Sequence, residues 1–252
     1  MCPAWRVHRR APARLYASRV TQAQPRDGTP GDAGPDGVLD LLGLLAYGEL
    51  VAFFQLSEDA ALAPSLADKA ALGGMAVAEF GHFQLLWEHL SALGAQPEAA
   101  MLPFAPALDA FHARTAPSDW LEGLVKAYVG DGIAADFYRA VAELVDPQTR
   151  ELVLRVLGDT GHAKFVIARV RAAIDADPQI RGRLALWARR LVGEALAQAY
   201  RVVADRPSLA SLLSAGSGEA SGGAAGLGDV GRMFARITDA HAARMTALGL
   251  AG

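Results

Sequence analysis

The stretch Glu79-Phe80-Gly81-His82-Phe83 decides how the rest of the chain is interpreted. A carboxylate and an imidazole three residues apart lie on one face of an α-helix, where both can reach the same metal ion. The same spacing recurs at Asp159 and His162, and a single acid precedes each pair, Glu49 in the first half and Asp131 in the second. The resulting order, acid, acid-x-x-His, acid, acid-x-x-His, is that of a two-metal carboxylate site in a four-helix bundle.

The spacing of the acids predicts where the helices turn. Two residues that face each other across antiparallel helices lie equally far from the connecting turn. In the first half the midpoint between the two acids is Pro64, and in the second half it is residue 145, beside Asp146 and Pro147. Aspartate as N-cap followed by proline at the first helical position is a helix start signal. Each half is therefore predicted to be an antiparallel helix pair.

A third acid-x-x-His match occurs at Asp109 and His112, and the spacing also arises by chance. This pair lies among Pro103, Pro106 and Pro117, where a continuous helix is not expected. We therefore set it aside as a metal motif.

A second acid, Asp136, competes with Asp131 for the third ligand position. Five residues apart on a helix, the two side chains point about 140° away from each other, so only one can face the metals. The distance from the turn at residues 145–147 favours Asp131. Asp136 is then expected behind the ligands or at the surface.

The chain is predicted to be all-α, because no stretch alternates like a strand while alanine and leucine recur at helical spacing. We expect four bundle helices, a fifth helix and a final amphipathic helix, at 37–57, 66–93, 119–145, 147–175, 181–203 and 229–248. Residues 94–118 are proline-rich and long enough for the crossover between the second and third helices that a ferritin-like bundle needs.

The predicted organisation is a disordered N-terminal extension at 1–36, a helical bundle at 37–206, a flexible low-complexity linker at 207–228 and a C-terminal helix at 229–252. The last helix is expected to pack against the bundle or a second subunit of a homo-oligomer. The extension is rich in arginine, which also fits an organellar transit peptide. Without an apolar stretch typical of a secretory signal, a cytoplasmic location is expected.

The segment 38–56 is apolar enough to raise the question of a membrane span, but it contains Asp40, Glu49 and Gln55. A bundle helix that is buried on most sides explains this composition better, so no membrane contact is expected.

Composition narrows the kind of site. The single cysteine, Cys2, excludes an internal disulfide and cysteine-based zinc or iron–sulfur sites. Carboxylate and imidazole ligands suit iron or manganese, whereas zinc would bind them without redox chemistry. Residues 37–146 carry 4 basic and 15 acidic residues, but residues 147–206 carry 11 basic and 6 acidic residues. The second part is therefore expected to attract anions.

Four stretches carry a resemblance to a known family: AYGEL at 46–50, EFGHF at 79–83, VGDGIAADFY at 129–138 and DTGH at 159–162. Through them residues 37–206 resemble the ferritin-like superfamily and, within it, the family of the tRNA 2-methylthio-isopentenyl-adenosine hydroxylase. The resemblance implies a di-iron centre that activates dioxygen and inserts one oxygen atom into a carbon–hydrogen bond.

By this resemblance each iron has two terminal ligands, and two acids bridge the irons. The terminal ligands would be Glu49 with His82 on one iron and Asp131 with His162 on the other, and the bridges would be Glu79 and Asp159. The two aspartates stand where the family usually has glutamates, which leaves the spacing of the irons open.

Three functions remain open at this point. The first is a di-iron hydroxylase or monooxygenase, whose substrate is a modified base of tRNA if the family resemblance holds. The others are a ferritin-like protein that binds or oxidises iron and a metal-free helical interaction protein. An oxygenase would need an external electron-donor protein, because the chain lacks the paired cysteines of a rubredoxin-type site.

Overall fold

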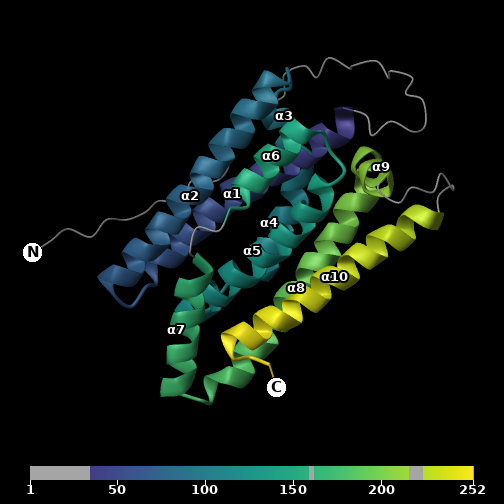
Figure 1. Ribbon diagram of the computed structural model, residues 1–252. Helices are drawn as coiled ribbons and strands as arrows, with labels where there is room; N and C mark the ends of the chain where they lie inside the picture. The colour runs from purple at the N-terminus through teal and green to yellow at the C-terminus, as the bar shows by residue number, and fades with distance from the viewer. Residues whose placement is uncertain (1–34, 159–161, 216–223, 252) are drawn as a thin grey trace, which may run out of the picture. The chain divides into compact units, whose positions relative to one another are not determined.

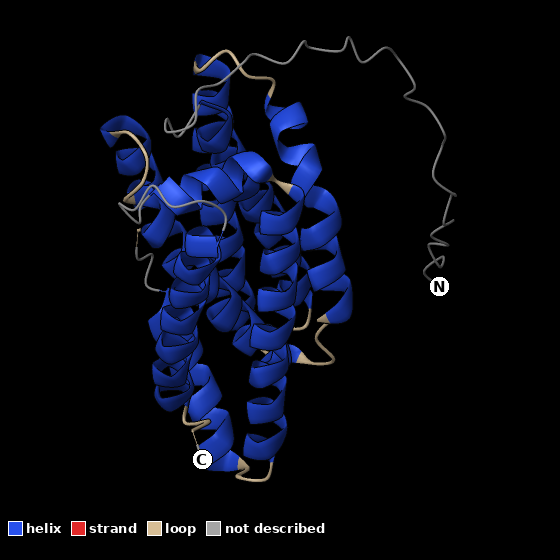
Figure 2. Cartoon of the chain, turned by 90° about the vertical axis from the view of Figure 1, so that its right-hand side faces the viewer, coloured by secondary structure: helices blue, strands red, loops and turns tan. Residues whose placement is uncertain are grey.

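The computed structural model describes residues 35–158, 162–215 and 224–251, and the elements within these ranges are helices (Figures 1 and 2). This confirms the all-α prediction. Residues 1–34 of the expected extension, residues 216–223 of the expected linker and the candidate ligand Asp159 lie outside the described residues.

Helices α1 (Pro35–Ala61) and α2 (Leu66–Ala92) pack along each other as an antiparallel pair (Figure 1). The turn between them contains Pro64, as the spacing of the acids predicted. Ser65 caps α2, because its side chain accepts a hydrogen bond from the backbone N–H of Asp68.

By length and composition α1 could cross a membrane. Half of its most apolar window is buried inside the protein, and Leu41, Leu42 and Leu45 have no exposed surface. The apolar sequence of α1 is thus used to pack the core of the bundle.

The second half begins with α5 (Trp120–Ala142), followed by α6 (Pro147–Val156) and α7 (His162–Ala176). The helix start predicted at Asp146 and Pro147 is confirmed: the Asp146 side chain accepts hydrogen bonds from the backbone N–H groups of Gln148 and Thr149. The single helix expected at 147–175 is wrong, because α6 ends at Val156. Gly158 favours this break, since glycine loses more conformational entropy in a helix than other residues.

The crossover is more helical than expected. It contains α3 (Pro97–Met101), a 3₁₀ turn η1 (Leu102–Phe104) and α4 (Ala105–Arg114). The expectation that Asp109 and His112 lie outside a helix is therefore wrong. Pro106 falls in the first turn of α4, where its missing N–H leaves no intrahelical hydrogen bond unmade.

Three further helices complete the described chain: α8 (Ile180–Asp205), α9 (Pro207–Ala215) and α10 (Ala224–Leu248). The linker expected from residue 207 is corrected, since residues 207–215 form α9 and bury Leu209, Leu212 and Leu213. Helix α9 packs on α1, and α10 packs on α5, α8 and α9 of the same chain.

A close contact between α1 and α3 yields a test of the packing. A Cβ atom on Gly43 would lie 2.2 Å from the backbone oxygen of Ala100, whereas one on Gly73 in α2 would meet nothing within 4 Å. We predict that Gly43→Ala lowers the free energy of unfolding by about 2 kcal/mol, because the helices must separate. Gly73→Ala should raise it by about 0.5–1 kcal/mol. Urea denaturation of both variants checks this, and equal effects would contradict the α1–α3 packing.

Candidate metal centre

Three of the predicted ligands meet between α1 and α2. Glu49 comes from α1, and Glu79 and His82 come from α2, with one ligand atom of each lying within 4.8 Å of the others. His82 Nδ1 is 3.3 Å from Glu49 Oε2 and 3.5 Å from Glu79 Oε2. Both glutamates are buried. Two carboxylates and an imidazole thus converge where a cation would be fully surrounded.

The electrostatics of this group favour a bound cation. Burial raises the pKa of Glu49 well above its usual value, and the nearby Glu79 adds to the shift. The pKa of Glu79 is lowered: burial opposes this, but the hydrogen bonds with His82 and Glu49 outweigh it. Hydrogen bonds with Glu49 and Glu79 raise the pKa of His82 to about 10. A proton on His82 therefore balances the carboxylates, and a metal ion bound here would replace that proton.

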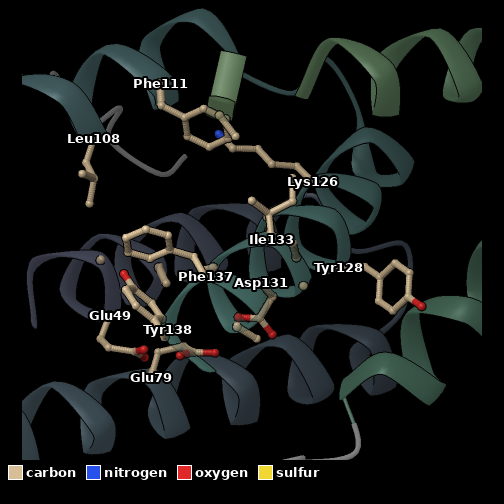
Figure 3. Close-up of a pocket in the computed structure, with 18 of the residues that line it drawn as sticks. Glu49, Glu79, Leu108, Phe111, Lys126, Tyr128, Asp131, Ile133, Phe137 and Tyr138 are labelled. Atoms are coloured by element: carbon tan, nitrogen blue, oxygen red, sulfur yellow. The ribbon is translucent and has the colours of Figure 1, made fainter. Parts of the chain in front are cut away.

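Asp131 from α5 and His162 from the start of α7 line the same cavity as Glu49 and Glu79. Figure 3 shows the carboxylate of Asp131 directed toward that of Glu79. The exposed surface of Asp131 faces the cavity, while burial of its carboxyl group raises the pKa to about 7, with the charge of Glu79 as the second cause. The charge of His162 in turn helps to lower the pKa of Glu79.

Of the five described residues among the six predicted ligands, Glu49, Glu79 and His82 form the close group, and Asp131 and His162 line the cavity beside it. Asp136, the competing acid, lies elsewhere: it forms ion pairs with Arg139, at 3.5 Å, and with Arg244 of α10. Asp131 lines the cavity, and its role as a ligand stays a prediction.

A cavity of about 580 Å³ extends from the carboxylates. Its walls are largely apolar and come from α1, α2, α4, α5, α7, α8 and α10, with Leu108, Phe111, Ile133 and Phe137 drawn in Figure 3. Volumes of this size accommodate small organic ligands. The carboxylates thus open onto a space much larger than a metal ion or dioxygen needs.

Sequence reasoning missed part of the cavity wall. Lys126 is one of three lysines in the chain, and its setting in the apolar run 124–129 was a usable signal. The other missed residue is His112, which belongs to the acid-x-x-His pair that was set aside as a metal motif. Gln198 of α8 also lines the cavity, whereas Glu194, one turn earlier on the same helix, pairs with Arg114 at 3.5 Å.

The chain belongs to the family of ferritin-like domains of actinomycetes, whose model matches residues 34–216. Its fold is similar to a solved structure described as protein 19 with aldehyde deformylating oxidase activity from Synechococcus, with 18% sequence identity and a TM-score of 0.58. That match covers 83% of this chain and 92% of the other. No curated protein sequence matches the chain. The predicted ferritin-like fold is thereby confirmed.

The two acids of α5 allow a matched comparison. Asp131 lines the cavity and Asp136 is held by arginines. We predict that Asp131→Asn lowers the iron bound per chain several-fold, because it removes an anionic ligand, while Asp136→Asn leaves loading near wild type. Iron analysis after anaerobic loading measures both. The reverse order would show that the wrong acid has been assigned.

Buried Lys126 makes a prediction about stability. Its side chain is 5% exposed, and burial lowers its pKa to about 8 although Asp59 and Glu58 favour the charged form. Burial lowers the pKa of His112, and the positive charge of Lys126 lowers it further. Below pH 8 the lysine is charged in both the folded and the unfolded states, so its burial costs stability. Above its unfolded pKa, near 10.4, it is neutral in both.

Lys126→Met is therefore expected to raise the free energy of unfolding at pH 7 by an amount on the order of 2 kcal/mol. The gain should shrink as the pH rises from 8 to above 10. Lys69→Met, at an exposed position of α2, serves as the control and should change little. A loss of stability in Lys126→Met at pH 7 would contradict the unfavourable burial inferred for this lysine.

Proposed function

We propose that this chain is a carboxylate-bridged di-iron protein that uses dioxygen, and electrons from an external donor protein, to oxidise a substrate held in the cavity. The observation that carries the proposal is the group of Glu49, Glu79 and His82 at the wall of a cavity that Asp131 and His162 also line. This is the ligand pattern of ferritin-like proteins, in which facing helices supply acids and acid-x-x-His pairs.

The residues fit iron on chemical grounds. Oxygen and nitrogen ligands with two or more carboxylates suit iron and also manganese, and the buried acids need a counter-charge that a cation supplies. Glu49, Glu79, His82, Asp131 and His162 would hold the metals, and Asp159 completes the proposed set. A pair of irons at these ligands would supply oxygen activation and the electrons for inserting one oxygen atom into a carbon–hydrogen bond.

The chain itself binds the substrate and controls protons and water. The apolar walls exclude water and orient an apolar molecule toward the ligands. The Tyr138 hydroxyl lies against α1 beside Glu49, where a Cβ atom on Gly48 would be 3.2 Å from it. Burial, followed by the charges of Glu49 and Asp131, raises the pKa of Tyr138 well above its usual value. Tyr138 therefore keeps its proton and can donate a hydrogen bond beside the metal ligands.

The cavity favours oxidation of an organic molecule over iron storage, because storage does not require an apolar chamber of this size. A small-molecule substrate also agrees with the described oxidase activity of the Synechococcus protein. The sequence resemblance implies a more specific reaction, hydroxylation of a modified tRNA base. The RNA-binding experiment below tests this hypothesis.

We predict that reduced, iron-loaded protein consumes dioxygen and that Glu79→Ala and His82→Ala abolish this while keeping wild-type helical content. Both variants should bind well below two irons per chain, the content of a di-iron site. Glu88→Ala, an exposed acid on the same helix, is the matched control and should behave as wild type. An oxygen electrode and iron analysis measure the two properties. Full iron occupancy in the two ligand variants would refute the site.

RNA binding separates the tRNA hypothesis from a small-molecule substrate. Phosphate contacts release counterions, so binding of tRNA should weaken steeply between low and moderate salt. Arg189→Gln with Arg190→Gln, on α8, should then weaken binding without removing iron. Absent or salt-insensitive binding would exclude the tRNA hypothesis and leave the oxygenase proposal standing.

A further inference from the structure

One end of the cavity holds a buried cation with unused hydrogen-bond donors. Lys126 extends from α5, and its Nζ donates to Gln55 Oε1 at 3.2 Å. The ammonium lies 5.7 Å from the centre of the Phe111 ring of α4. Among the described residues it makes no ion pair within 4.0 Å. Because an ammonium carries three N–H donors, at least one is available for a ligand.

Two other titratable side chains, Asp59 and His112, line the cavity together with Lys126. Asp59 is buried and packs against Gly123 of α5, where a Cβ atom would lie 3.0 Å from the Asp59 carboxylate. His112 also lines the cavity, and its buried Nδ1 has no hydrogen-bond partner in the described part of the protein. Burial raises the pKa of Asp59 to about 6, so at neutral pH it is largely ionised and offsets part of the Lys126 charge without forming an ion pair with it.

Lys126 differs in this respect from the other cations of the wall. Arg139 and Arg244 also line the cavity, and both are paired with Asp136. Among the described cavity-lining lysines and arginines, Lys126 is thus the one that makes no ion pair. An anionic group that enters the cavity can accept a charge-assisted hydrogen bond from it.

The Lys126 end lies a defined distance from the metal ligands. Lys126 precedes Asp131 by five residues on α5, a rise of about 7.5 Å, and Gln55 follows Glu49 by six residues on α1, about 9 Å. In Figure 3, Lys126 and Phe111 lie on one side of the view and the three acids on the other, with Ile133 and Phe137 between them. An extended chain covers about 1.2 Å per bond, so at least six or seven carbon–carbon bonds are needed for this axial separation alone.

We propose that the Lys126 end of the cavity is a head-group subsite that binds the carboxylate of an aliphatic substrate and directs a carbon at least six or seven bonds away toward the metal ligands. Lys126 donates to the carboxylate, His112 supplies a second donor through its ring nitrogen, and the apolar walls hold the chain. This inference rests on the proposed function for its second half, the delivery of the chain to the metals. The subsite itself depends only on the cavity.

The test is calorimetric binding of octanoate and 1-octanol to the iron-loaded, full-length protein under anaerobic conditions. Both ligands share a chain, but only octanoate carries the charge. Octanoate is expected to bind at least about tenfold more tightly than octanol, the effect of one charge-assisted hydrogen bond. Lys126→Met should remove this preference by weakening octanoate about tenfold, while octanol affinity and iron content stay unchanged. Lys69→Met is the matched control and should bind both ligands as wild type does.

Several outcomes would overturn the subsite. These are no binding of octanoate, equal affinity for acid and alcohol, or octanoate binding that survives Lys126→Met but is lost in Glu79→Ala, which would place the carboxylate on the metals. Lys126-dependent octanoate binding in a protein that fails to bind iron would support the subsite while refuting the proposed function. The two proposals can therefore fail separately.

Discussion

Two carboxylates that face each other inside a packed helix pair are the constraint on which the rest of this structure depends. Glu49 and Glu79 are both buried, and like charges so placed are unfavourable unless a cation balances them. Without metal, the proton of His82 takes this role, which explains why its pKa is raised to about 10. The turn around Pro64 fixes the register of α1 and α2 and keeps the two acids opposite each other.

The helices fall into two groups, those that carry candidate metal ligands and those that only line the cavity. Helices α1, α2, α5 and α7 carry the candidate ligands, and α4, α8 and α10 contribute only to the wall. Ligands on long packed helices are held rigidly, whereas the covering helices set the shape of the space beside them. In the proposed function the substrate is therefore selected by the cavity wall, to which α4, α8 and α10 add residues and α5 adds Lys126.

Much of this arrangement was predictable because helical geometry links spacing to position. Equal distances from a turn located Pro64 and Asp146, and the same reasoning separated Asp131 from Asp136. The expectations that proved wrong concern where helices begin and end. At these places the helix propensity of a residue competes with the effect of its position in the fold. Pro106 begins α4 because proline is tolerated in a first helical turn, and α6 stops near Gly158 although the apolar pattern continues.

Lys126 could not be assigned a role from sequence, because its partners come from distant segments. Gln55 lies on α1 and Phe111 on α4, and neither spacing nor composition places them against α5. The metal ligands recur at regular spacing within helix pairs, so their pattern can be recognised in the sequence. The proposed subsite, with residues from three separate helices, leaves no such periodic trace.

Anomalous X-ray diffraction at the iron absorption edge, from crystals of the iron-loaded protein, tests the central claim most directly. The account predicts two iron peaks per chain, each within bonding distance of acids and histidines drawn from Glu49, Glu79, His82, Asp131, Asp159 and His162. A single peak, or iron bound elsewhere while these side chains keep the His82–carboxylate hydrogen bonds, would contradict it.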